Sequence, residues 1–442
     1  MAKRYFISTF GCQANERDSE TLAGLLEKKG YIRTNDIQQA DIILFNTCCI
    51  REKAENKVLS KVGELKELKE QNPDLIIGIC GCMVQQEKMA EKIRHRASHV
   101  DLIFGTHNLE QLPELIDKLQ ETKKSQVQIL ADREEIREGL PAVRQVPFKA
   151  LVNITYGCNN FCTYCIVPYV RGREKSRQPQ NILAEIKELA NEGVIEVMLL
   201  GQNVNSYGQT LEPPFTFAQL LQEVNNIDKL KRIRYMTSHP RDFNPELIKT
   251  ISQLDKVCPH FHLPLQSGSN KILQKMNRGY TREHYQELVE EIRRLVPQAS
   301  ITTDLIVGFP GETEEDFRDT LNLVEELRFD SAFTFIYSPR SGTAAAKMLA
   351  QIPLTVKKRR LQKLMQLQNK ISLEINQNLK GQVMEVLVEG LSQKDAAILE
   401  GRTKTNKTVL FTGAEELIGK FVEVEITIPQ TWVLKGEIIE KR

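Results

Sequence analysis

Three cysteines lie close together near the middle of the chain, Cys158, Cys162 and Cys165, in a CxxxCxxC spacing. The apolar run 150–155 that precedes them is typical of a buried strand, so we expect the thiols in the loop that follows it. Thiolates at this density bind zinc, iron–sulfur clusters or copper. A structural zinc site takes four protein ligands, and no fourth cysteine or histidine lies nearby. The spacing therefore favours an iron–sulfur cubane with one iron open to another molecule, over a zinc site or buried thiols.

Three more cysteines, Cys12, Cys48 and Cys82, each follow a predicted strand. They are 36 and 34 residues apart, about one strand–helix–strand unit each. Because the carboxyl ends of parallel strands form one crevice, we expect these thiols to converge on a second three-cysteine site. Adjacent glycines would let a bulky cluster approach the backbone. Burial as small apolar side chains is the alternative, but it does not explain three cysteines in step with the strands.

Composition limits the possible classes of protein. The 442 residues predict about three domains, and the net charge of +2 means that any nucleic-acid surface must be local. No apolar run approaches the roughly 20 residues of a membrane span, and the N-terminus enters a strand without a signal peptide. We therefore expect a cytoplasmic protein with no membrane partner, whose nine cysteines are not disulfide-bonded.

The predicted elements indicate an α/β protein. Strands at 4–9, 41–45, 75–79 and 100–104 alternate with helices, which predicts a doubly wound parallel sheet over residues 1–120. A polar linker, 121–145, contains Gly139 and Pro141. Residues 146–375 contain six strand–helix units, enough for a partial, open (β/α)6 barrel, with its active site at the carboxyl ends of the strands. A long helix over 354–379 leads to short strands in 376–442, which predict a small β-barrel with Trp432 near its end.

The CxxxCxxC loop, with an aromatic residue before its last cysteine, resembles the signature of radical S-adenosylmethionine (SAM) enzymes. The resemblance implies that the open iron of a [4Fe-4S] cluster chelates SAM and cleaves it to a 5′-deoxyadenosyl radical. Within that superfamily, Gly11-Cys12-Gln-Ala-Asn15, Asn46-Thr47-Cys48 and Gly81-Cys82 resemble the N-terminal domain of methylthiotransferases. This implies a second [4Fe-4S] cluster on Cys12, Cys48 and Cys82. It gives no ligand role to the neighbouring Cys49 and Cys80.

The resemblance also implies contacts with SAM in the loops after the barrel strands. The residues that it assigns to SAM are Tyr164, Gly201, Gln202, Asn203, Ser238, Gly308, Phe309, Pro310 and Gly311. His239 and His262 are candidates for acid–base chemistry, but hydrogen abstraction by a carbon radical depends more on positioning than on a tuned pKa.

Two basic segments are candidates for RNA contacts. Arg171, Arg173 and Arg177 follow the cysteine loop directly and could bind phosphates, although a solvated loop is an equally good reading of this charge run. The tail resembles a TRAM domain, an RNA-binding module. Its stretch 401–407 would be an exposed hairpin that presents Arg402, Lys404 and Lys407 to RNA.

The stretches 165–174 and 201–207 resemble the methylthiotransferase branch that acts on tRNA. That branch adds a methylthio group to the C-2 carbon of prenylated adenosine at position 37, which makes the anticodon stem-loop the expected partner. A low-potential electron donor such as flavodoxin or ferredoxin and a monomeric state are also expected. The alternatives are the branches for threonylcarbamoyl-adenosine or a ribosomal-protein aspartate and, in another class, a non-catalytic iron–sulfur RNA-binding or redox-sensing protein.

Overall fold

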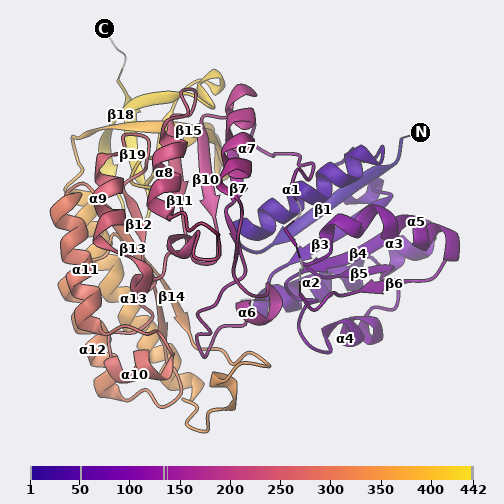
Figure 1. The fold of residues 1–442 in the computed structure, drawn as a ribbon, viewed down its shortest axis with the longest axis horizontal. Helices are drawn as coiled ribbons and strands as arrows, with labels where there is room; N and C mark the ends of the chain where they lie inside the picture. The colour runs from indigo at the N-terminus through magenta and orange to yellow at the C-terminus, as the bar shows by residue number, and fades with distance from the viewer. Residues whose placement is uncertain (1, 50–51, 133–134, 137, 440–442) are drawn as a thin grey trace.

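The computed structural model describes residues 2–49, 52–132, 135–136 and 138–439. The N-terminal α/β domain lies beside a larger central domain, and the C-terminal barrel sits against one end of the central strands (Figure 1). Among the helices of the described residues, each is too short or too polar to cross a bilayer.

The first domain is a six-stranded parallel sheet in the order β2-β1-β3-β4-β5-β6. Its strands are β1 (Arg4–Phe10), β2 (Ile32–Arg33), β3 (Ile42–Thr47), β4 (Ile76–Gly81), β5 (Leu102–Phe104) and β6 (Gln126–Gln128). One face packs against α1 (Gln13–Lys28) and α5 (Leu112–Thr122), and the other against α2 (Glu52–Glu64), α3 (Lys66–Gln71) and α4 (Met89–Arg96). The doubly wound sheet is thus confirmed. It continues through β6, beyond the domain end that we predicted at residue 120.

The strand order reverses between β1 and β3, because the chain places β2 on the outer side of β1 before returning to form β3. Such a switch point opens a crevice at the carboxyl ends of the two strands. Cys12 follows β1 and Cys48 follows β3, so both lie at this crevice.

The central domain contains six parallel strands in two sheets of three, β11-β10-β7 and β12-β13-β14. The strands are β7 (Lys149–Asn153), β10 (Glu196–Leu200), β11 (Arg232–Tyr235), β12 (His260–His262), β13 (Ser300–Val307) and β14 (Ser331–Ile336). A parallel bridge between Ile233 and Val257 links the end of one sheet to the segment that leads into the other. The open six-unit barrel is therefore confirmed.

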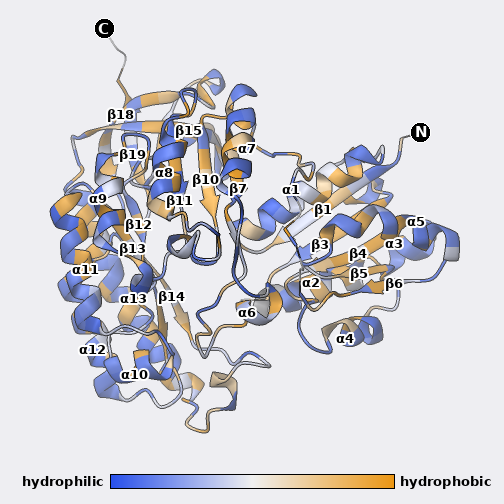
Figure 2. Ribbon diagram, in the orientation of Figure 1, coloured by the Kyte–Doolittle hydropathy of each residue, from blue (hydrophilic) through white to orange (hydrophobic). Residues whose placement is uncertain are grey.

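Amphipathic helices cover the outside of this partial barrel (Figure 1). They are α7 (Pro179–Asn191), α8 (Phe217–Asn225), α9 (Pro245–Gln253), α11 (Arg282–Leu295), α12 (Glu314–Leu327) and α13 (Leu354–Gln377). Figure 2 shows the strands as mainly hydrophobic and the outer helices as mixed, as expected when each helix buries one face. The short helices α6 (Val167–Val170) and α10 (Asn270–Lys275) and the β8 (Thr155–Tyr156)–β9 (Lys175–Ser176) pair were not predicted.

The C-terminal domain is a closed five-stranded barrel in the order β15-β16-β17-β19-β18. Its strands are β15 (Val383–Ser392), β16 (Asp395–Thr403), β17 (Thr408–Thr412), β18 (Phe421–Pro429) and β19 (Leu434–Ile438). Closure leaves no sheet edge exposed to pair with other chains. Alternate inward side chains such as Val386, Val388 and Val424 fill its interior.

The hairpin 401–407 is not the exposed loop that we predicted. It packs against the amino ends of the central strands, where Arg232 Nη1 donates to the Arg402 carbonyl (2.8 Å). Arg234 Nη2 donates to the Thr403 carbonyl (2.8 Å). The side chain of Lys407 reaches Asp330 Oδ1 (2.7 Å), and that of Lys404 reaches the Asp255 carbonyl (3.1 Å). The hairpin therefore fixes the small barrel to the central domain.

Candidate active site

The CxxxCxxC loop follows β7, as predicted, and comes directly after the short strand β8. Backbone hydrogen bonds hold it. Cys158 N donates to the Gly172 carbonyl (3.1 Å), and Cys165 N donates to the Cys162 carbonyl (2.9 Å). Gly157 has φ +70°, and a Cβ there would overlap the backbone of Arg173. Only glycine suits both demands. The backbone contacts thus fix the conformation of the cysteine loop without a bound cofactor.

Burial dominates the chemistry of these thiols. It raises the pKa of Cys158 to about 11 and that of Cys165 to about 12. Nearby Cys162 adds to both shifts, since a second thiolate would repel the first. Thiols that stay protonated in the bare site release their protons when iron binds, because a bound cation reverses the preference. The loop therefore has the donor chemistry of an iron–sulfur site.

Arg278, which sequence reasoning missed, lies against this loop and is only 4% exposed. Its Nη1 lies 3.3 Å from Cys162 Sγ and 3.4 Å from the Tyr164 hydroxyl, and its Nη2 donates to the Pro264 carbonyl (2.7 Å). A buried guanidinium beside a ligand thiol offsets part of the negative charge that a cluster site accumulates. The sequence gives little indication of this role, because Arg278 is a single arginine beside Gly279 in the loop between α10 and α11.

The loops of Cys12 and Cys48 meet at the switch point of the sheet. Cys48 N donates to the Phe10 carbonyl (2.7 Å), which places it beside the end of β1. The side chains of Asn15 and Asn46 hydrogen-bond to each other (3.1 Å), and Cys12 Sγ lies 3.5 Å from Asn15 Oδ1. These asparagines explain the motifs around Cys12 and Cys48, because they connect the two cysteine loops.

Cys82 has an unusual polar environment. Cys49 donates a hydrogen bond to its sulfur, and with Arg171 this lowers the pKa of Cys82 to about 6 against the effect of burial. Arg171 Nε lies 3.2 Å from Cys82 Sγ, and Arg171 Nη2 lies 2.8 Å from Asp18 Oδ2. Cys80, in contrast, is fully buried among apolar side chains of the α1 and α5 face. Cys49 therefore contacts the thiol that we predicted as a cluster ligand, whereas Cys80 belongs to the core.

Cys82 and its neighbour Cys49 lie at the interface with the central domain. Cys49 and Cys82 pack with Ile166 and Val170, which directly follow the CxxxCxxC loop. Cys49 also lies within electrostatic range of Cys165. No group of three or more metal-binding side chains in the described residues is gathered tightly enough for a single ion. A cubane takes each cysteine on a different iron, so its ligands stand further apart than those of a single ion.

The predicted SAM contacts divide into two groups. Gly201 and Gln202 line a small cavity between the domains that Asp18 and Thr155 also border. The Asn203 side chain is instead buried and bridges two loops, donating to Asp242 Oδ2 (2.6 Å) and accepting from His239 N (3.1 Å). Ser238 is buried beside it. These two residues shape the loops, and their direct contact with SAM stays a prediction.

The glycine loop after β13 packs against the cysteine loop. Phe309 is fully buried in an apolar cluster with Tyr337, and Tyr164 packs on the same cluster. Gly308 and Gly311 both have positive φ (73° and 76°), and Pro310 between them is buried. The Phe309 ring thus anchors the loop in the protein core. This brings Tyr164 and the glycine loop together, as expected from the resemblance.

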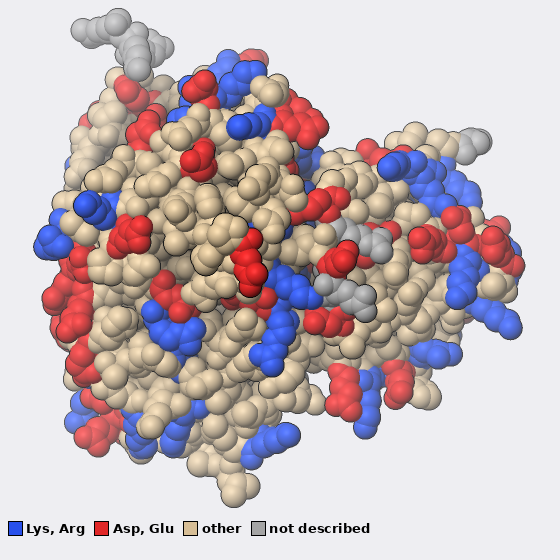
Figure 3. Space-filling view, viewed as in Figure 1, with Lys and Arg blue, Asp and Glu red and all other residues tan. Residues whose placement is uncertain are grey.

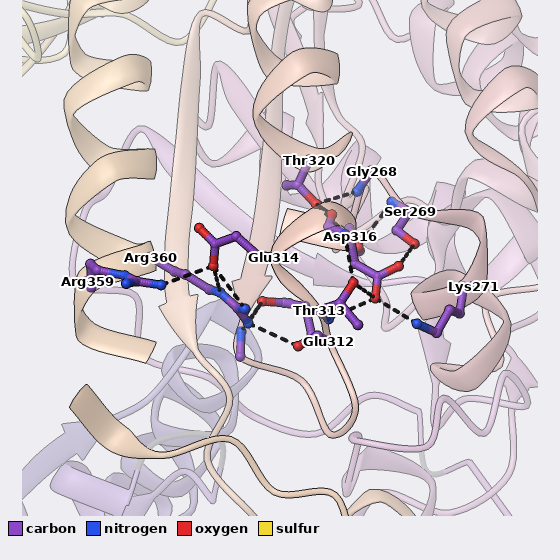
Figure 4. Close-up of polar contacts among 12 residues, drawn as sticks. Gly268, Ser269, Lys271, Glu312, Thr313, Glu314, Asp316, Thr320, Arg359 and Arg360 are labelled. Carbon is purple, nitrogen blue, oxygen red and sulfur yellow. Dashed lines mark hydrogen bonds and ion pairs between the residues drawn. The ribbon is translucent and has the colours of Figure 1, made fainter. Parts of the chain in front are cut away.

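Charged side chains brace this loop from behind (Figure 4). Arg360 Nη1 lies 2.7 Å from Glu312 Oε1, and both side chains are at least 95% buried. Asp316 Oδ1 accepts from Ser269 Oγ (2.7 Å), and its Oδ2 accepts from Thr313 N (2.8 Å) in a capping box at the start of α12. Thr313 thus caps α12, and the network connects the loops after β12 and β13.

The carboxyl ends of the strands also carry unsatisfied polar atoms and strained backbone. Thr155 Oγ1, His239 Nε2 and Gln266 Oε1 are buried and lack a hydrogen-bond partner among the described residues. Thr237 and Gln266 have φ of 71° and 72°, which is unfavourable for side chains of these types. Such features collect where a ligand is bound. Unsatisfied polar atoms at this end of the strands would suit a polar cofactor such as SAM.

The two histidine candidates differ in environment. Burial lowers the pKa of His239 to about 2, so its imidazole is neutral, and its Nδ1 accepts from Arg241 N (3.3 Å). His262 Nδ1 lies 3.0 Å from Thr302 Oγ1, and its Nε2 lies 3.6 Å from Asp304 Oδ1. Neither arrangement requires that the histidine transfer a proton. This agrees with the expectation that hydrogen abstraction by a carbon radical depends more on positioning than on a tuned pKa.

Comparison with known proteins agrees with this division of the chain. Residues 152–324 match the radical SAM superfamily, residues 377–439 match the TRAM domain, and residues 4–105 match the uncharacterized protein family UPF0004. A tRNA-2-methylthio-N(6)-dimethylallyladenosine synthase from Moorella thermoacetica is 57% identical over 99% of both chains. One from Thermoanaerobacter pseudethanolicus is 55% identical over 99% of this chain and 93% of its own. The chain belongs to this synthase family.

Solved structures support the fold of the synthase family. The radical SAM methyltransferase TsrM from Kitasatospora setae, with cobalamin and a [4Fe-4S] cluster bound, aligns with a TM-score of 0.56. The alignment covers 78% of this chain and 74% of TsrM at 14% identity. At that identity the likeness concerns the fold alone. Membership of the radical SAM superfamily implies SAM and a [4Fe-4S] cluster, and the CxxxCxxC loop lies inside the matched region.

In this member of the synthase family, the basic candidates for RNA contacts have mostly other partners. Arg177 is buried and pairs with Glu138 and Glu185. Arg171 pairs with Asp18. Arg173 is exposed, with its guanidinium 4.3 Å from the centre of the Phe161 ring. Of the three, Arg173 is thus the one presented to solvent, and Arg171 has the more specific position beside Cys82.

Proposed function

We propose that this protein methylthiolates the C-2 carbon of N6-prenylated adenosine at position 37 of tRNA. The arrangement that carries the proposal is the pair of three-cysteine sets on opposite sides of one interface, with Cys49 and Cys82 packed against the segment after Cys165. A single-cluster radical SAM enzyme would need only one set. The names of the 52–58% identical relatives support the choice of substrate.

Cys158, Cys162 and Cys165 would hold one [4Fe-4S] cluster, and Cys12, Cys48 and Cys82 would hold a second. Together with SAM, the clusters would supply radical hydrogen abstraction and the sulfur-bearing group. The chain's own residues would position SAM and shield it from water. Gly308 to Gly311 would seat SAM, and the buried loops around Asn203 would exclude water from the space between the domains.

The substrate is tested by mass spectrometry of tRNA nucleosides from a deletion strain. Loss of the methylthio group from prenylated adenosine, restored by the wild-type gene but not by Cys12→Ala or Cys158→Ala, would support the proposal. Intact levels, with the threonylcarbamoyl analogue affected instead, would refute it. Production of 5′-deoxyadenosine by the purified protein with SAM and reductant separates a catalyst from an iron–sulfur binding protein.

A further inference from the structure

A groove of about 530 Å³ lies between β14, α13 and the C-terminal barrel. Its lining residues come from the inner side and amino ends of the central strands and from the barrel, not from the cysteine loops. The volume is within the range of small-ligand sites. The groove is therefore a second recess, distinct from the space between the two cysteine sets.

Large apolar side chains are exposed along this groove. Trp432, the single tryptophan of the chain, is 72% exposed. Phe333 is 51% exposed and Met365 is 41% exposed. All three line the same recess. An aromatic residue left open to water next to other apolar side chains marks a surface that binds something.

The Trp432 ring is held in place rather than free. Its indole N–H donates to Asn369 Oδ1 (3.3 Å) on α13. Asn376 Nδ2, on the same face of that helix, donates to the carbonyls of Gln430 (2.8 Å) and Thr431 (3.2 Å) in the turn before it. A pre-positioned aromatic face loses little entropy when a planar ligand stacks on it.

The polar groups that line the groove indicate which kind of ligand it could bind. Gln368 is 97% buried and lines the recess, and its amide donates to the Phe329 carbonyl (2.8 Å). Its Oε1 is enclosed and has no partner among the described residues, which makes it an unused acceptor in the wall of the groove. Arg402 and Lys407 also line the groove, and each has a carboxylate partner. Glu389 Oε2 lies 3.4 Å from Arg402 Nε, and Asp330 Oδ1 lies 2.7 Å from Lys407 Nζ. The recess thus combines aromatic faces, a buried acceptor and two cations that are each paired with a carboxylate.

We propose that this groove stacks one unpaired nucleobase of the RNA substrate, outside the catalytic pocket. This inference rests on the proposed function, since it takes the substrate to be an RNA stem-loop. Single-stranded loops are recognised by stacking of splayed bases on aromatic side chains, with hydrogen bonds to the base edges. Trp432 and Phe333 provide the faces, and Gln368 Oε1 accepts from a base N–H.

The test uses the full-length protein and a synthetic anticodon stem-loop that contains prenylated adenosine. Stacking should quench the Trp432 fluorescence on titration with RNA, and no second tryptophan interferes. Trp432→Ala and Phe333→Ala, followed by the anisotropy of labelled RNA, should each weaken binding roughly 5- to 100-fold, the range for one stacked base. Trp432→Phe should retain most of the affinity. Ile428→Ala is the matched control, since Ile428 is 55% exposed on the same barrel but outside the groove.

Abasic substitutions, one loop position at a time, identify the base. At the position that stacks, the Trp432→Ala penalty should disappear. If the wild type binds RNA but no position couples to Trp432, and its fluorescence is unchanged, the inference is overturned while the proposed function stands. If the wild type fails to bind the stem-loop, the proposed function itself fails. A fluorescence change with a protein electron donor but not with RNA would assign the groove to a protein partner and overturn the inference.

Discussion

Arg171 gives the sharpest test of how the two cysteine sites are built. Its guanidinium touches Cys82 Sγ (3.2 Å) and Asp18 Oδ2 (2.8 Å), and the Arg171 and Asp18 side chains are 10% and 9% exposed. Arg171→Met would leave a buried carboxylate without its cation. Breaking a buried pair in this way costs about 3–5 kcal/mol of stability. Removal of a group that contacts a metal ligand typically lowers metal affinity about 10- to 100-fold.

Two measurements separate these effects. Chemical unfolding of the iron-free protein reports the ion pair, and anaerobic reconstitution with iron counting and EPR reports each cluster. Asp18→Asn in the Arg171→Met background removes the orphan charge, so it should recover stability without recovering iron at the N-terminal site. Arg173→Met, on the same loop but exposed, is the control and should leave both quantities unchanged. Normal stability and a full iron complement in Arg171→Met would refute the reasoning.

Three further outcomes are expected. Arg360→Met leaves the buried Glu312 carboxylate without its cation and should lower the free energy of unfolding by about 3–5 kcal/mol. Arg359→Met is the control, since it breaks only a surface pair whose side chains are 57% and 48% exposed, and it should lower that free energy by less than about 1 kcal/mol. Equal losses would contradict the network of Figure 4. Burial raises the pKa of Glu174 to about 7 from 4.5, so the folded state keeps a proton that the unfolded state releases as pH rises through this window. The stability of Glu174→Gln relative to wild type should therefore rise by up to about 3 kcal/mol between pH 4 and pH 8, and a pH-independent difference would refute the assignment. Gly308→Ala forces a side chain into φ +73° and into the Lys357 side chain, and it should weaken SAM binding in calorimetry, with an unchanged Kd as the contrary result.

Local patterns were enough to predict the three-part architecture. The β/α rhythm and the apolar strands define the doubly wound sheet and the six-unit barrel, because each element carries its own periodicity. The positions of Cys12, Cys48, Cys82 and the CxxxCxxC loop after strands followed from the same pattern. The edge strand β6 was missed because Gln126–Gln128 has only Val127 as an apolar residue, and its pairing with β5 depends on the rest of the sheet.

The charged residues could not be placed from sequence. Arg171, Arg177 and Lys407 were predicted as RNA contacts, yet each is paired with a carboxylate from a distant part of the chain. Partners 39 to 153 residues away leave no local signal. Figure 3 shows acidic and basic side chains interspersed over the face drawn, without a broad field of one sign, so net charge gave no guide either.

The hairpin 401–407 shows how the true partners of basic residues bear on function. Its cations were expected to face RNA, but its carbonyls accept from Arg232 and Arg234 at the amino ends of the central strands. Arg234 is in turn fixed by Glu196 Oε2 (2.9 Å). The small barrel is thus held at a set position relative to the central strands, whose opposite ends carry the cysteine loop. An RNA held by that barrel would meet the cysteine sites at a defined distance, so the docking contacts govern where the target base can reach. The surface that recognises RNA must then be sought among the residues that docking leaves open, and Trp432 is the most exposed aromatic among them in the described part of the chain.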